Sequence, residues 1–288
     1  MLQADNVTLE YGPTSAGLKP RPTPVTPTPG AVRAEPVEAR TERPGLHGVS
    51  LEIRRGSLFG ILGPNGSGKT TLLRILAGIL PPATGRVLLD GVDLRHLSRR
   101  AVARRVAVVP QETHLAFDYS VLEIALMGRY PHLGDFSLEG PRDVQIAREA
   151  LAATGTLDLA RRSFSTLSGG EKQRVVIASA LAQAAELMLL DEPTASLDLG
   201  YQIEIASLVR RLNEQRGVTV IIATHDLNFA ASVCTELALL REGRLAASGA
   251  AESVLTPEAI GGLYGIEADV GRHPATGRLV VVPIRKAS

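Results

Sequence analysis

Residues 63–71, GPNGSGKTT, have the composition of a loop that binds phosphate. They match the pattern G-x-x-x-x-G-K-[ST] and stand between the apolar run SLFGIL and the helix-like run TTLLRILAG. Glycines let the backbone curl so that successive amides face an anion, and the positive end of the next helix attracts it. We expect Lys69 to reach the β- and γ-phosphates of a nucleotide and the Thr70 hydroxyl to bind Mg²⁺. The predicted nucleotide contacts in this loop are Gly63, Pro64, Asn65, Gly66, Ser67, Gly68, Lys69, Thr70 and Thr71.

Two adjacent carboxylates, Asp191 and Glu192, follow the apolar run LMLL. A buried strand would deliver Asp191 to its carboxyl end, where α/β folds bind ligands, and this position suits a Mg²⁺ ligand. Glu192, one residue further along, is a candidate general base for an attacking water. The alternative is a solvated acid at the end of a strand, and the phosphate loop upstream favours catalysis.

Two more polar residues each follow a predicted strand. His225 comes after VTVIIAT and is a candidate contact for the γ-phosphate or for the attacking water. Gln111 comes after VAVVP and is a candidate Mg²⁺ ligand or sensor of the nucleotide. Together with Lys69 and Glu192, these residues predict a phosphoryl-transfer site in which positioning and electrostatics do most of the catalysis.

Strands and helices that alternate along the chain must position these residues. The predicted elements before residue 168 are strands at 7–11, within 49–62, near 86–89 and at 106–109, a helix at about 69–79 and a mainly helical region at about 112–165. From residue 168 the predicted order is helix, strand at 187–191, helix at 202–215, strand at 218–224, helix at 226–234 and two further strands. This order predicts an α/β fold with a mostly parallel sheet covered by helices on both faces.

Two regions differ from this core. Segment 12–44 holds 8 of the chain's 18 prolines and has almost no large apolar residues, so we interpret it as a disordered surface insertion. A proline-rich ligand for another domain is the alternative for this segment. We expect residues 1–250 to form the main domain and residues 251–288 to form a small appendage of a short helix and a β-hairpin.

Composition and charge restrict the class of protein. A chain of 288 residues with 44% hydrophobic residues can bury a sizeable core. Its formal net charge of +1 gives no overall electrostatic footprint for nucleic acid, and we interpret five arginines within 95–105 as the solvated face of a helix. The single cysteine, Cys234, excludes an internal disulfide, fits a reducing compartment and is expected to be buried. No secretory signal or membrane span is visible, so we expect a cytoplasmic chain that meets a membrane only through a partner.

A second glycine-rich helix start, LSGGEKQR at 167–174, predicts a second anion site, which a single phosphate loop does not explain. With it, the sequence closely resembles the ATP-binding cassette (ABC) ATPases, over nearly the whole chain apart from 12–44. GPNGSGKTT, Gln111, LSGGE, LMLLDE, the SLD at 196–198 and His225 occur in the order typical of that family. The resemblance implies a P-loop NTPase fold with a mostly parallel core sheet, an antiparallel β subdomain and an inserted helical subdomain at 112–167.

The resemblance also assigns roles. It implies a homodimer in which two cassettes meet head to tail, so that Ser168 and Gly170 contact the γ-phosphate of ATP held by the partner's loop. It implies that Glu192 is the general base and that His225 stabilises the γ-phosphate. The remaining residues that the resemblance places at the nucleotide are Gly169 and Glu171 beside that helix start, Asp198 at the same interface, and Tyr11 stacked on adenine.

Two segments, SVLEIALMGRYPHLGDF and the tail LYGIEADVGRHPATGRLVVVP, look like the cassettes of importers for ferric siderophores, haem and cobalamin. This likeness implies an ATP-hydrolysing subunit that uses ATP and Mg²⁺ and lies on the inner face of the cell membrane. Its partners would be two integral membrane permease subunits and an extracytoplasmic solute-binding protein that delivers the cargo. No contact with nucleic acid is implied.

Three rival interpretations remain. A DNA-repair or chromosome-organising ATPase would separate the two halves of the motif set by a long coiled coil. Here Gln111 and Ser168 are only 57 residues apart, and no sustained heptads lie between them. A translation-associated ABC protein would carry two cassettes. A nucleotide-dependent switch that does not hydrolyse ATP would not need Glu192 and His225. An ABC ATPase of a different transporter class is the nearest alternative.

We predict that deletion of residues 12–44 leaves ATPase activity largely intact, because the segment contains none of the catalytic candidates. Phosphate release by the purified deletion variant, measured over a range of ATP concentrations, tests this expectation. A collapse of ATP affinity would instead show that the insertion helps to position Tyr11.

Overall fold

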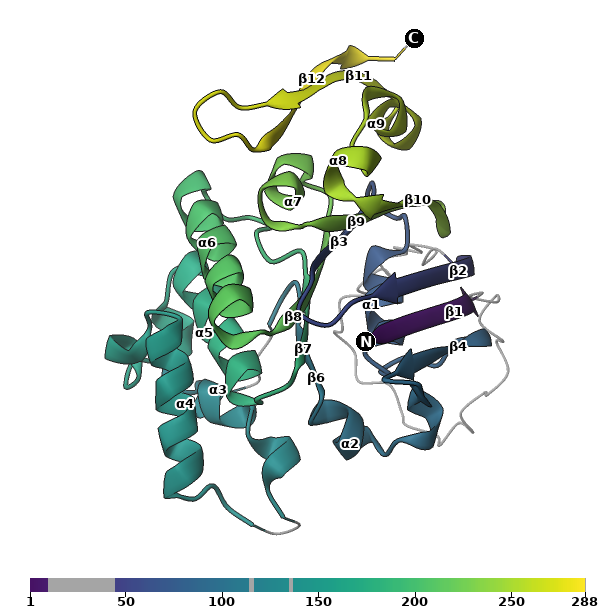
Figure 1. Ribbon diagram of the computed structural model, residues 1–288. Helices are drawn as coiled ribbons and strands as arrows, with labels where there is room; N and C mark the ends of the chain where they lie inside the picture. Colours follow the sequence, from purple (N-terminus) through teal and green to yellow (C-terminus); the bar gives the residue numbers. More distant parts are fainter. Residues whose placement is uncertain (10–44, 114–116, 135–136, 288) are drawn as a thin grey trace, which may run out of the picture.

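A six-stranded sheet forms the centre of the fold in the computed structural model, which describes residues 1–9, 45–113, 117–134 and 137–287 (Figure 1). Tyr11 and the predicted insertion at 12–44 lie outside the described residues. The strand order is β10-β9-β3-β8-β7-β6, and all neighbours are parallel except β9 and β10. The strands are β3 (Leu58–Leu62), β6 (Val106–Val109), β7 (Leu187–Asp191), β8 (Thr219–Thr224), β9 (Glu236–Arg241) and β10 (Arg244–Ala250).

Both faces of this sheet are buried, which explains why its central strands are continuous apolar runs. Along β7, Leu187 and Leu189 point into the core on one face, whereas Met188 and Leu190 point into the core on the other. Adjacent residues of a strand face opposite sides, so each strand contributes to two separate cores. The predicted bounds of β6 and β7 are confirmed residue by residue.

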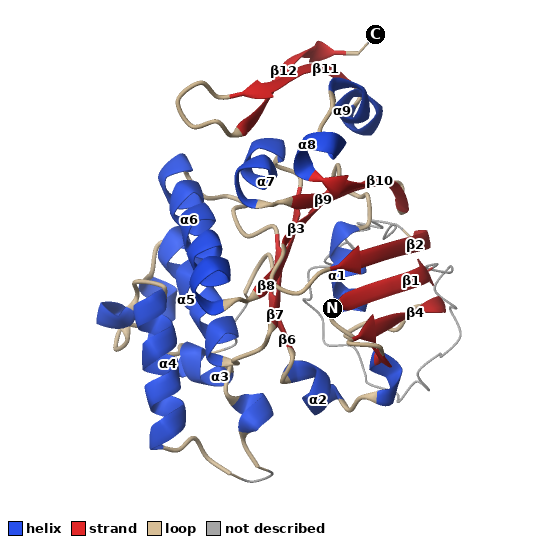
Figure 2. Cartoon of the chain, viewed as in Figure 1, coloured by secondary structure: helices blue, strands red, loops and turns tan. Residues whose placement is uncertain are grey.

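One face of the sheet packs against α1 and a second, antiparallel sheet of order β2-β1-β4-β5 (Figure 2). Its strands are β1 (Leu2–Leu9), β2 (Leu46–Ile53), β4 (Thr84–Leu89) and β5 (Val92–Asp93), and the helix is α1 (Lys69–Leu76). The prediction of a first strand at 7–11 is wrong at its start. An irregular register around Asn6, whose φ is +48°, interrupts the apolar alternation that marks the strand.

Helices cover the other face of the sheet and form the lateral region at the left of Figure 1. They are α3 (Val121–Met127), α4 (Pro141–Ala153), α5 (Gly169–Ala182), α6 (Leu199–Arg216) and α7 (Leu227–Val233), with short 3₁₀ turns at Tyr130–His132, Leu157–Leu159 and Phe164–Thr166. Helices α3, α4 and α5 pack on one another through a shared core that includes Ile124, Leu151 and Ile177. The expected α/β fold with an antiparallel subdomain and an inserted helical region is therefore confirmed.

The arginine-rich segment at 95–105 is only in part the solvated helix face that its sequence suggests, because Arg95, Arg99 and Arg104 are exposed whereas Arg100 and Arg105 are half-buried. It forms a 3₁₀ turn (Leu94–His96) and a short helix, α2 (Arg99–Ala103). Arg100 and Arg104 both donate to the carbonyl oxygen of Pro131, at 3.0 and 2.8 Å. Arg105 pairs with Asp90 and with Glu186, 2.6 Å away. These arginines join the helical region, the antiparallel sheet and the central sheet, so their role is structural.

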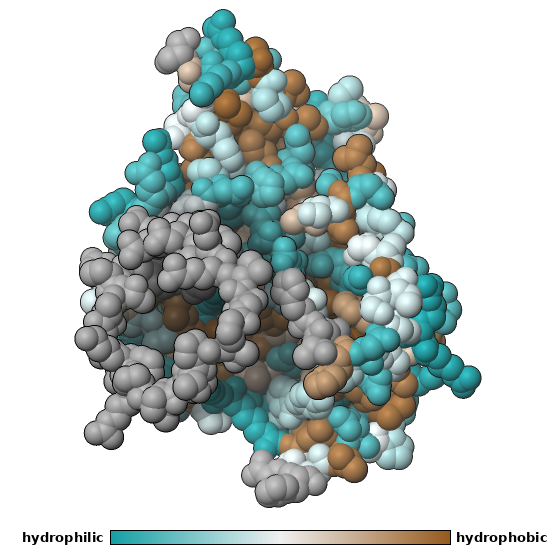
Figure 3. All heavy atoms as spheres, turned by 180° about the vertical axis from the view of Figure 1, so that it is seen from behind, coloured by the Kyte–Doolittle hydropathy of each residue, from teal (hydrophilic) through white to brown (hydrophobic). Residues whose placement is uncertain are grey.

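The C-terminal appendage, described here over residues 251–287, lies over α7 at the top of Figure 1. It consists of α8 (Ala251–Val254), α9 (Pro257–Tyr264) and a hairpin of β11 (Ile266–Arg272) and β12 (Leu279–Lys286). Hydrophobic surface lies beside hydrophilic surface at this end of the molecule (Figure 3). The division into two domains at residue 250 stays a prediction.

Two further features are the burial of the lone cysteine and the length and polarity of the helices. Cys234 is 5% exposed, and burial raises the pKa of its thiol to about 12, so it packs as a small apolar residue. Within the part of the chain that is described, every helix is too short or too polar to cross a membrane.

We predict that Leu189→Ala lowers the free energy of unfolding by about 2–5 kcal/mol, because a fully buried leucine at the centre of β7 would leave a cavity. Urea denaturation of the purified chain measures this change. The matched control is Leu138→Ala, at a side chain that is 88% exposed, for which we expect a change within about 0.5 kcal/mol. Equal losses for both variants would contradict the assignment of this core.

Candidate functional site

The site is built where four neighbouring parallel strands end at one edge of the central sheet. In the register, Leu62 at the end of β3 pairs with Thr224 of β8, and Asp191 at the end of β7 pairs with Ala223. β6 ends at Val109, one pair earlier along β7. The residues that follow these strand ends are Gly63, His225, Glu192 and Gln111. Hydrogen-bonded register, and not sequence proximity, therefore brings these four predicted site residues to the same edge.

The phosphate loop between β3 and α1 needs its glycines for conformation and for space. Gly66 and Gly68 have φ values of +82° and +100°, a region that side chains rarely adopt. A Cβ on Gly63 would lie 2.2 Å from the carbonyl oxygen of Leu240, so no larger residue fits there. The hydroxyl of Ser67 is buried and has no partner among the described residues. A curled backbone with an unsatisfied buried hydroxyl fits a loop that completes its hydrogen bonds with a ligand.

Lys69 is a buried cation that lies between the loop and a carboxylate. It is 6% exposed, and its ammonium donates to the carbonyl oxygens of Gly63 at 2.9 Å and Pro64 at 3.2 Å. Its Nζ lies 3.4 Å from Oε1 of Glu192. Burial lowers the pKa of Lys69, and the charge of Glu192 opposes that effect. An incoming polyphosphate would supply negative charge to a cation that has lost most of its hydration.

Thr70 and Asp191, two of the three predicted Mg²⁺ ligands, are in direct contact. The Thr70 hydroxyl donates to Oδ1 of Asp191 at 3.0 Å, and Asp191 is 8% exposed. Burial raises the pKa of Asp191, and the hydrogen bond from Thr70 partly opposes the shift. A hydroxyl and a carboxylate side by side are hard oxygen donors of the kind that Mg²⁺ prefers, so the residues present fit this ion. Among the described residues no cluster of three or more histidine, cysteine or acidic side chains could hold a metal.

Glu192 and His225 form a hydrogen-bonded pair across adjacent strand ends. Nδ1 of His225 lies 2.8 Å from Oε2 of Glu192, whose φ is +48°. The backbone amide of Glu192 donates to the carbonyl oxygen of Ala223 at 2.8 Å, and this bond holds the left-handed turn at Glu192 in place. A glutamate in this sparsely populated conformation is a strained residue, and such strain concentrates at functional sites.

An open cavity of about 440 Å³ lies at this edge of the sheet, a size suited to a small-molecule ligand. Its lining consists of Asn65, Gly66, Gly68, Lys69, Thr70, Thr71, Arg74, Gln111, Glu192 and His225. Gln111 therefore lies at the site, as predicted. Arg74 was missed by sequence reasoning, although its spacing of four residues from Thr70 puts both on one face of α1. Its charge acts to lower the pKa of Asp191, so it belongs to the electrostatics of the site.

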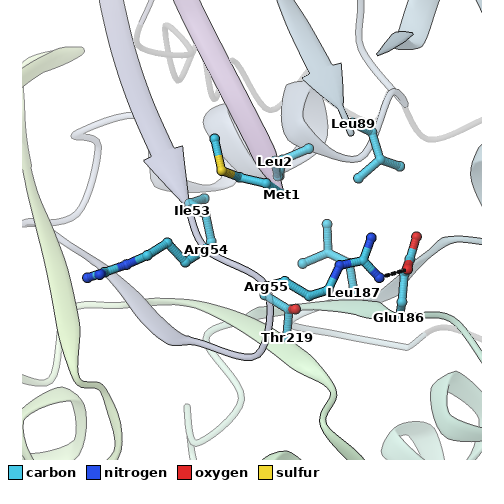
Figure 4. Close-up of a pocket in the computed structure, with 9 residues that line it drawn as sticks. All are labelled: Met1, Leu2, Ile53, Arg54, Arg55, Leu89, Glu186, Leu187 and Thr219. Atoms are coloured by element: carbon cyan, nitrogen blue, oxygen red, sulfur yellow. Dashed lines mark hydrogen bonds and ion pairs between the residues drawn. The ribbon is translucent and has the colours of Figure 1, made fainter. Parts of the chain in front are cut away.

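A second cavity, at the opposite end of the same strands, is too small for a nucleotide (Figure 4). It lies beside Leu187 and Thr219, where β7 and β8 begin, and Arg55 reaches across it to Glu186 at 2.5 Å. Its volume of about 20 Å³ holds about one water molecule. This cavity is a packing defect between the two sheets, spanned by an ion pair.

The second glycine-rich helix start, at residues 168–171, lies outside the cavity at the phosphate loop. Ser168 caps α5: its hydroxyl accepts from the amide of Glu171 at 3.3 Å, and the Glu171 carboxylate accepts from the amide of Ser168 at 2.8 Å. A Cβ on Gly170 would lie 2.1 Å from the ring of Tyr201, so this glycine makes room for that ring. The Tyr201 hydroxyl lies 3.2 Å from the Ser168 hydroxyl.

The structure therefore brings the predicted site residues together in two groups. Ser168, Gly169, Gly170, Glu171 and Asp198 are absent from the lining of the cavity at the phosphate loop. Asp198 caps α6 through the amide of Tyr201, at 3.0 Å, beside the start of α5. Tyr201 was not predicted, because nothing in the sequence near LSGGE indicates it. The roles of both groups toward a nucleotide stay predictions.

Comparison with known proteins decides the family. The profile of the ABC transporter family matches residues 46–195, which include the phosphate loop, LSGGE and the Asp191–Glu192 pair. The chain belongs to the ABC transporter family. The resemblance drawn from the motifs is thereby confirmed.

Relatives of this ABC cassette carry names of importer subunits. It is 46% identical over 250 residues to the hemin import ATP-binding protein HmuV of Gloeobacter violaceus, covering 84% of this chain and 90% of that protein. It is 40% identical over 240 residues to the ferric enterobactin transport ATP-binding protein FepC of Escherichia coli, covering 83% and 89%. It is 44% identical over 239 residues to the cobalamin import ATP-binding protein BtuD of Halobacterium salinarum, covering 83% of this chain. The aligned part spans only 60% of that last protein.

Solved structures agree with the fold. A metal-chelate type ABC transporter in an inward-facing conformation has a chain that is 28% identical, with a TM-score of 0.79, covering 99% of this chain and 98% of that one. A dimeric bacterial ABC transporter cassette is 27% identical, with a TM-score of 0.69, covering 87% and 99%. The cassette fold is thus common to the whole described chain.

We predict that Asp191→Asn raises the free energy of unfolding at pH 7 in the absence of nucleotide. Because the pKa of Asp191 is raised in the folded state, the folded chain binds more protons than the unfolded chain, and ionisation of this group destabilises the fold as pH rises. The amide removes that cost, so the gain should shrink as pH falls toward the range in which the carboxyl is neutral in both states.

Urea denaturation at a series of pH values, from neutral to acidic, measures the difference between Asp191→Asn and the unchanged chain. Asp158→Asn, at an exposed aspartate, is the control and should change stability little at every pH. A loss of stability in Asp191→Asn that is constant with pH would contradict the assigned cost of burial.

Proposed function

We propose that this chain is the ATP-hydrolysing subunit of an ABC importer that takes up a metal chelate. The observation that carries the proposal is the convergence of Lys69, Thr70, Glu192 and His225 on one cavity at the carboxyl edge of the sheet, with Asp191 hydrogen-bonded to Thr70 beside it. A phosphate loop, a carboxylate for a metal and a second carboxylate paired with histidine are the parts that hydrolysis of a nucleoside triphosphate requires.

Each group has a distinct task in this reaction. The loop amides and Lys69 bind the phosphates and neutralise charge as the terminal phosphoryl group departs. Glu192 accepts a proton from the attacking water. His225, whose Nδ1 lies 2.8 Å from Oε2 of Glu192, fixes the orientation of that carboxylate. Thr70 and Asp191 would hold Mg²⁺, which neutralises charge on the phosphates when it is bound. Gln111, which also lines the cavity, completes the contacts at the metal or the nucleotide.

We propose that a second copy of the chain completes the site. The start of α5 offers backbone amides and the helix dipole to an anion, yet it lies outside the cavity that holds this chain's own phosphate loop. In a head-to-tail homodimer, Ser168 and Gly170 would contact the γ-phosphate bound by the partner, with Asp198 at the same interface. The dimeric arrangement of a related cassette supports this assembly.

The cargo and the membrane partners are inferred from relatives. Proteins at 40–46% identity are named for import of hemin, ferric enterobactin and cobalamin, and all three are compact metal chelates. We therefore propose that the homodimer lies on the inner face of the cell membrane beneath two permease subunits, with a solute-binding protein on the outside. Closure of the dimer on ATP and its opening after hydrolysis would supply the motion for transport.

We predict that Glu192→Gln lowers the rate of ATP hydrolysis by about 10²- to 10⁴-fold, the usual contribution of a general base, while ATP binding is retained. Phosphate release and equilibrium nucleotide binding by the purified chain measure the two quantities. Glu214→Gln, at an exposed glutamate on α6, is the matched control and should hydrolyse ATP normally. Full turnover by Glu192→Gln would remove the assignment of the base.

Transport is tested in the host cell with the same variant. Cells whose chain carries Glu192→Gln receive labelled cobalamin, a ferric siderophore or haem in parallel. Loss of uptake of one compound identifies the cargo and the direction of transport. Normal accumulation of all three, with the variant protein present, contradicts import of these chelates and leaves ATP hydrolysis as a separate conclusion.

A further inference from the structure

The C-terminal appendage is hydrogen-bonded to the segment that carries His225. The hydroxyl of Tyr264, the last residue of α9, donates to the backbone carbonyl oxygen of His225 at 3.2 Å. Asn228, in the first turn of α7, donates to the carbonyl oxygen of Val281 at 3.1 Å and accepts from its amide at 2.9 Å. Both α9 and β12 therefore hold the short stretch from residue 225 to residue 228.

Apolar packing reinforces these bonds. A small cluster of Ile260, Ala268 and Val281, all buried, also includes Leu227 and the ring of Tyr264. Leu227 packs in addition against the core beneath the central sheet. Figure 1 shows α9 and the hairpin lying over α7. The residue two positions after His225 is thus fixed on one side by the main core and on the other by the appendage.

The imidazole of His225 has little else to fix its direction. Its side chain is 51% exposed, and among the described residues the ring makes one hydrogen bond, to Glu192. The orientation of such a side chain depends on where its backbone lies. Before it, Thr224 is 1% exposed within β8; after it, Asp226 caps α7 by accepting from the amide of Phe229 at 2.9 Å. Tyr264 holds the carbonyl oxygen between these two fixed points.

The Tyr264 hydroxyl is a dependable donor. Burial, with the nearby charges of Glu192 and Asp226, raises the pKa of Tyr264 above its usual range. The hydroxyl therefore keeps its proton through the neutral pH range. Among the described residues, its one acceptor is the carbonyl oxygen of His225.

We propose that Tyr264 is a positioning residue for His225. Through the backbone of His225, the C-terminal appendage sets the direction of the imidazole toward Glu192 and the phosphate end of the cavity. This inference rests on the proposed ATP hydrolysis, because His225 acts on the reacting groups only in that reaction.

Tyr264→Phe is the direct test, because it removes one oxygen atom and keeps the ring in its apolar cluster. We expect kcat for ATP hydrolysis by the purified full-length chain to fall roughly two- to tenfold, the range for loss of one neutral hydrogen bond, with KM for ATP unchanged. KM should hold because the phosphate loop is untouched. Tyr130→Phe, at a tyrosine that is 57% exposed, is the matched control and should keep the kcat of the unchanged chain.

A double-mutant cycle separates positioning from a general loss of structure. In a His225→Ala background, Tyr264→Phe should cause no further fall in kcat, because its effect passes through the imidazole. An equal fall in both backgrounds, or a rise in KM with kcat unchanged, would overturn the proposal.

A readout that needs no hydrolysis distinguishes this inference from the proposed function. The NMR chemical shifts of the His225 imidazole, assigned by comparison with His225→Ala, should differ between the unchanged chain and Tyr264→Phe. If the unchanged chain hydrolyses no ATP but these chemical shifts differ, the proposed function fails and the positioning contact stands. Identical His225 chemical shifts in both chains overturn the contact itself.

Discussion

The parallel register of β3, β8, β7 and β6 is the constraint on which the rest of the structure depends. Each of these strands ends at the same edge, so four short loops that are far apart in sequence present their polar residues to one cavity. The strands can do this only because both of their faces are buried, which makes them apolar along their full length. Polar groups appear where burial by the sheet stops, and there they meet.

The cost of this arrangement is the desolvation of charge. Lys69, Asp191 and Glu192 are all less than 10% exposed, and burial moves the pKa of Lys69 down and that of Asp191 up. Contacts within the cluster offset part of the cost of desolvation: Nζ of Lys69 lies 3.4 Å from Oε1 of Glu192, and the Thr70 hydroxyl donates to Asp191. Such a cluster of buried charges is less stable alone than with a bound ligand that neutralises it. Stability has been exchanged here for a preorganised site.

Local patterns in the sequence were enough to predict the fold class, β6 and β7 to the residue, and the loop at 63–71. They succeeded because burial on both faces and helix starts leave signals within a few residues. Tyr201 left no such signal, because it meets Gly170 only through the packing of α6 on α5. Arg74 left a weaker one, its spacing of four residues from Thr70 on α1, and reaches the cavity from the second turn of that helix. The structural contacts of Arg104 and Arg105 were not predicted because their partners Asp90, Pro131 and Glu186 are not adjacent in sequence.

Tyr264 belongs with these long-range contacts, and its place explains why an appendage can matter to chemistry that it does not touch. The first part of the appendage belongs to the main core, through Ala251, Val254, Leu255 and Leu263, whereas the hairpin of β11 and β12 is held by the small cluster that contains Ala268 and Val281. A hairpin attached by so small a cluster opens at a lower free energy than the sheet does. Such an opening would break the hydrogen bonds between Val281 and Asn228, close to His225, while the phosphate loop stays intact. The phosphate loop and the backbone of His225 are therefore held by separate parts of the molecule.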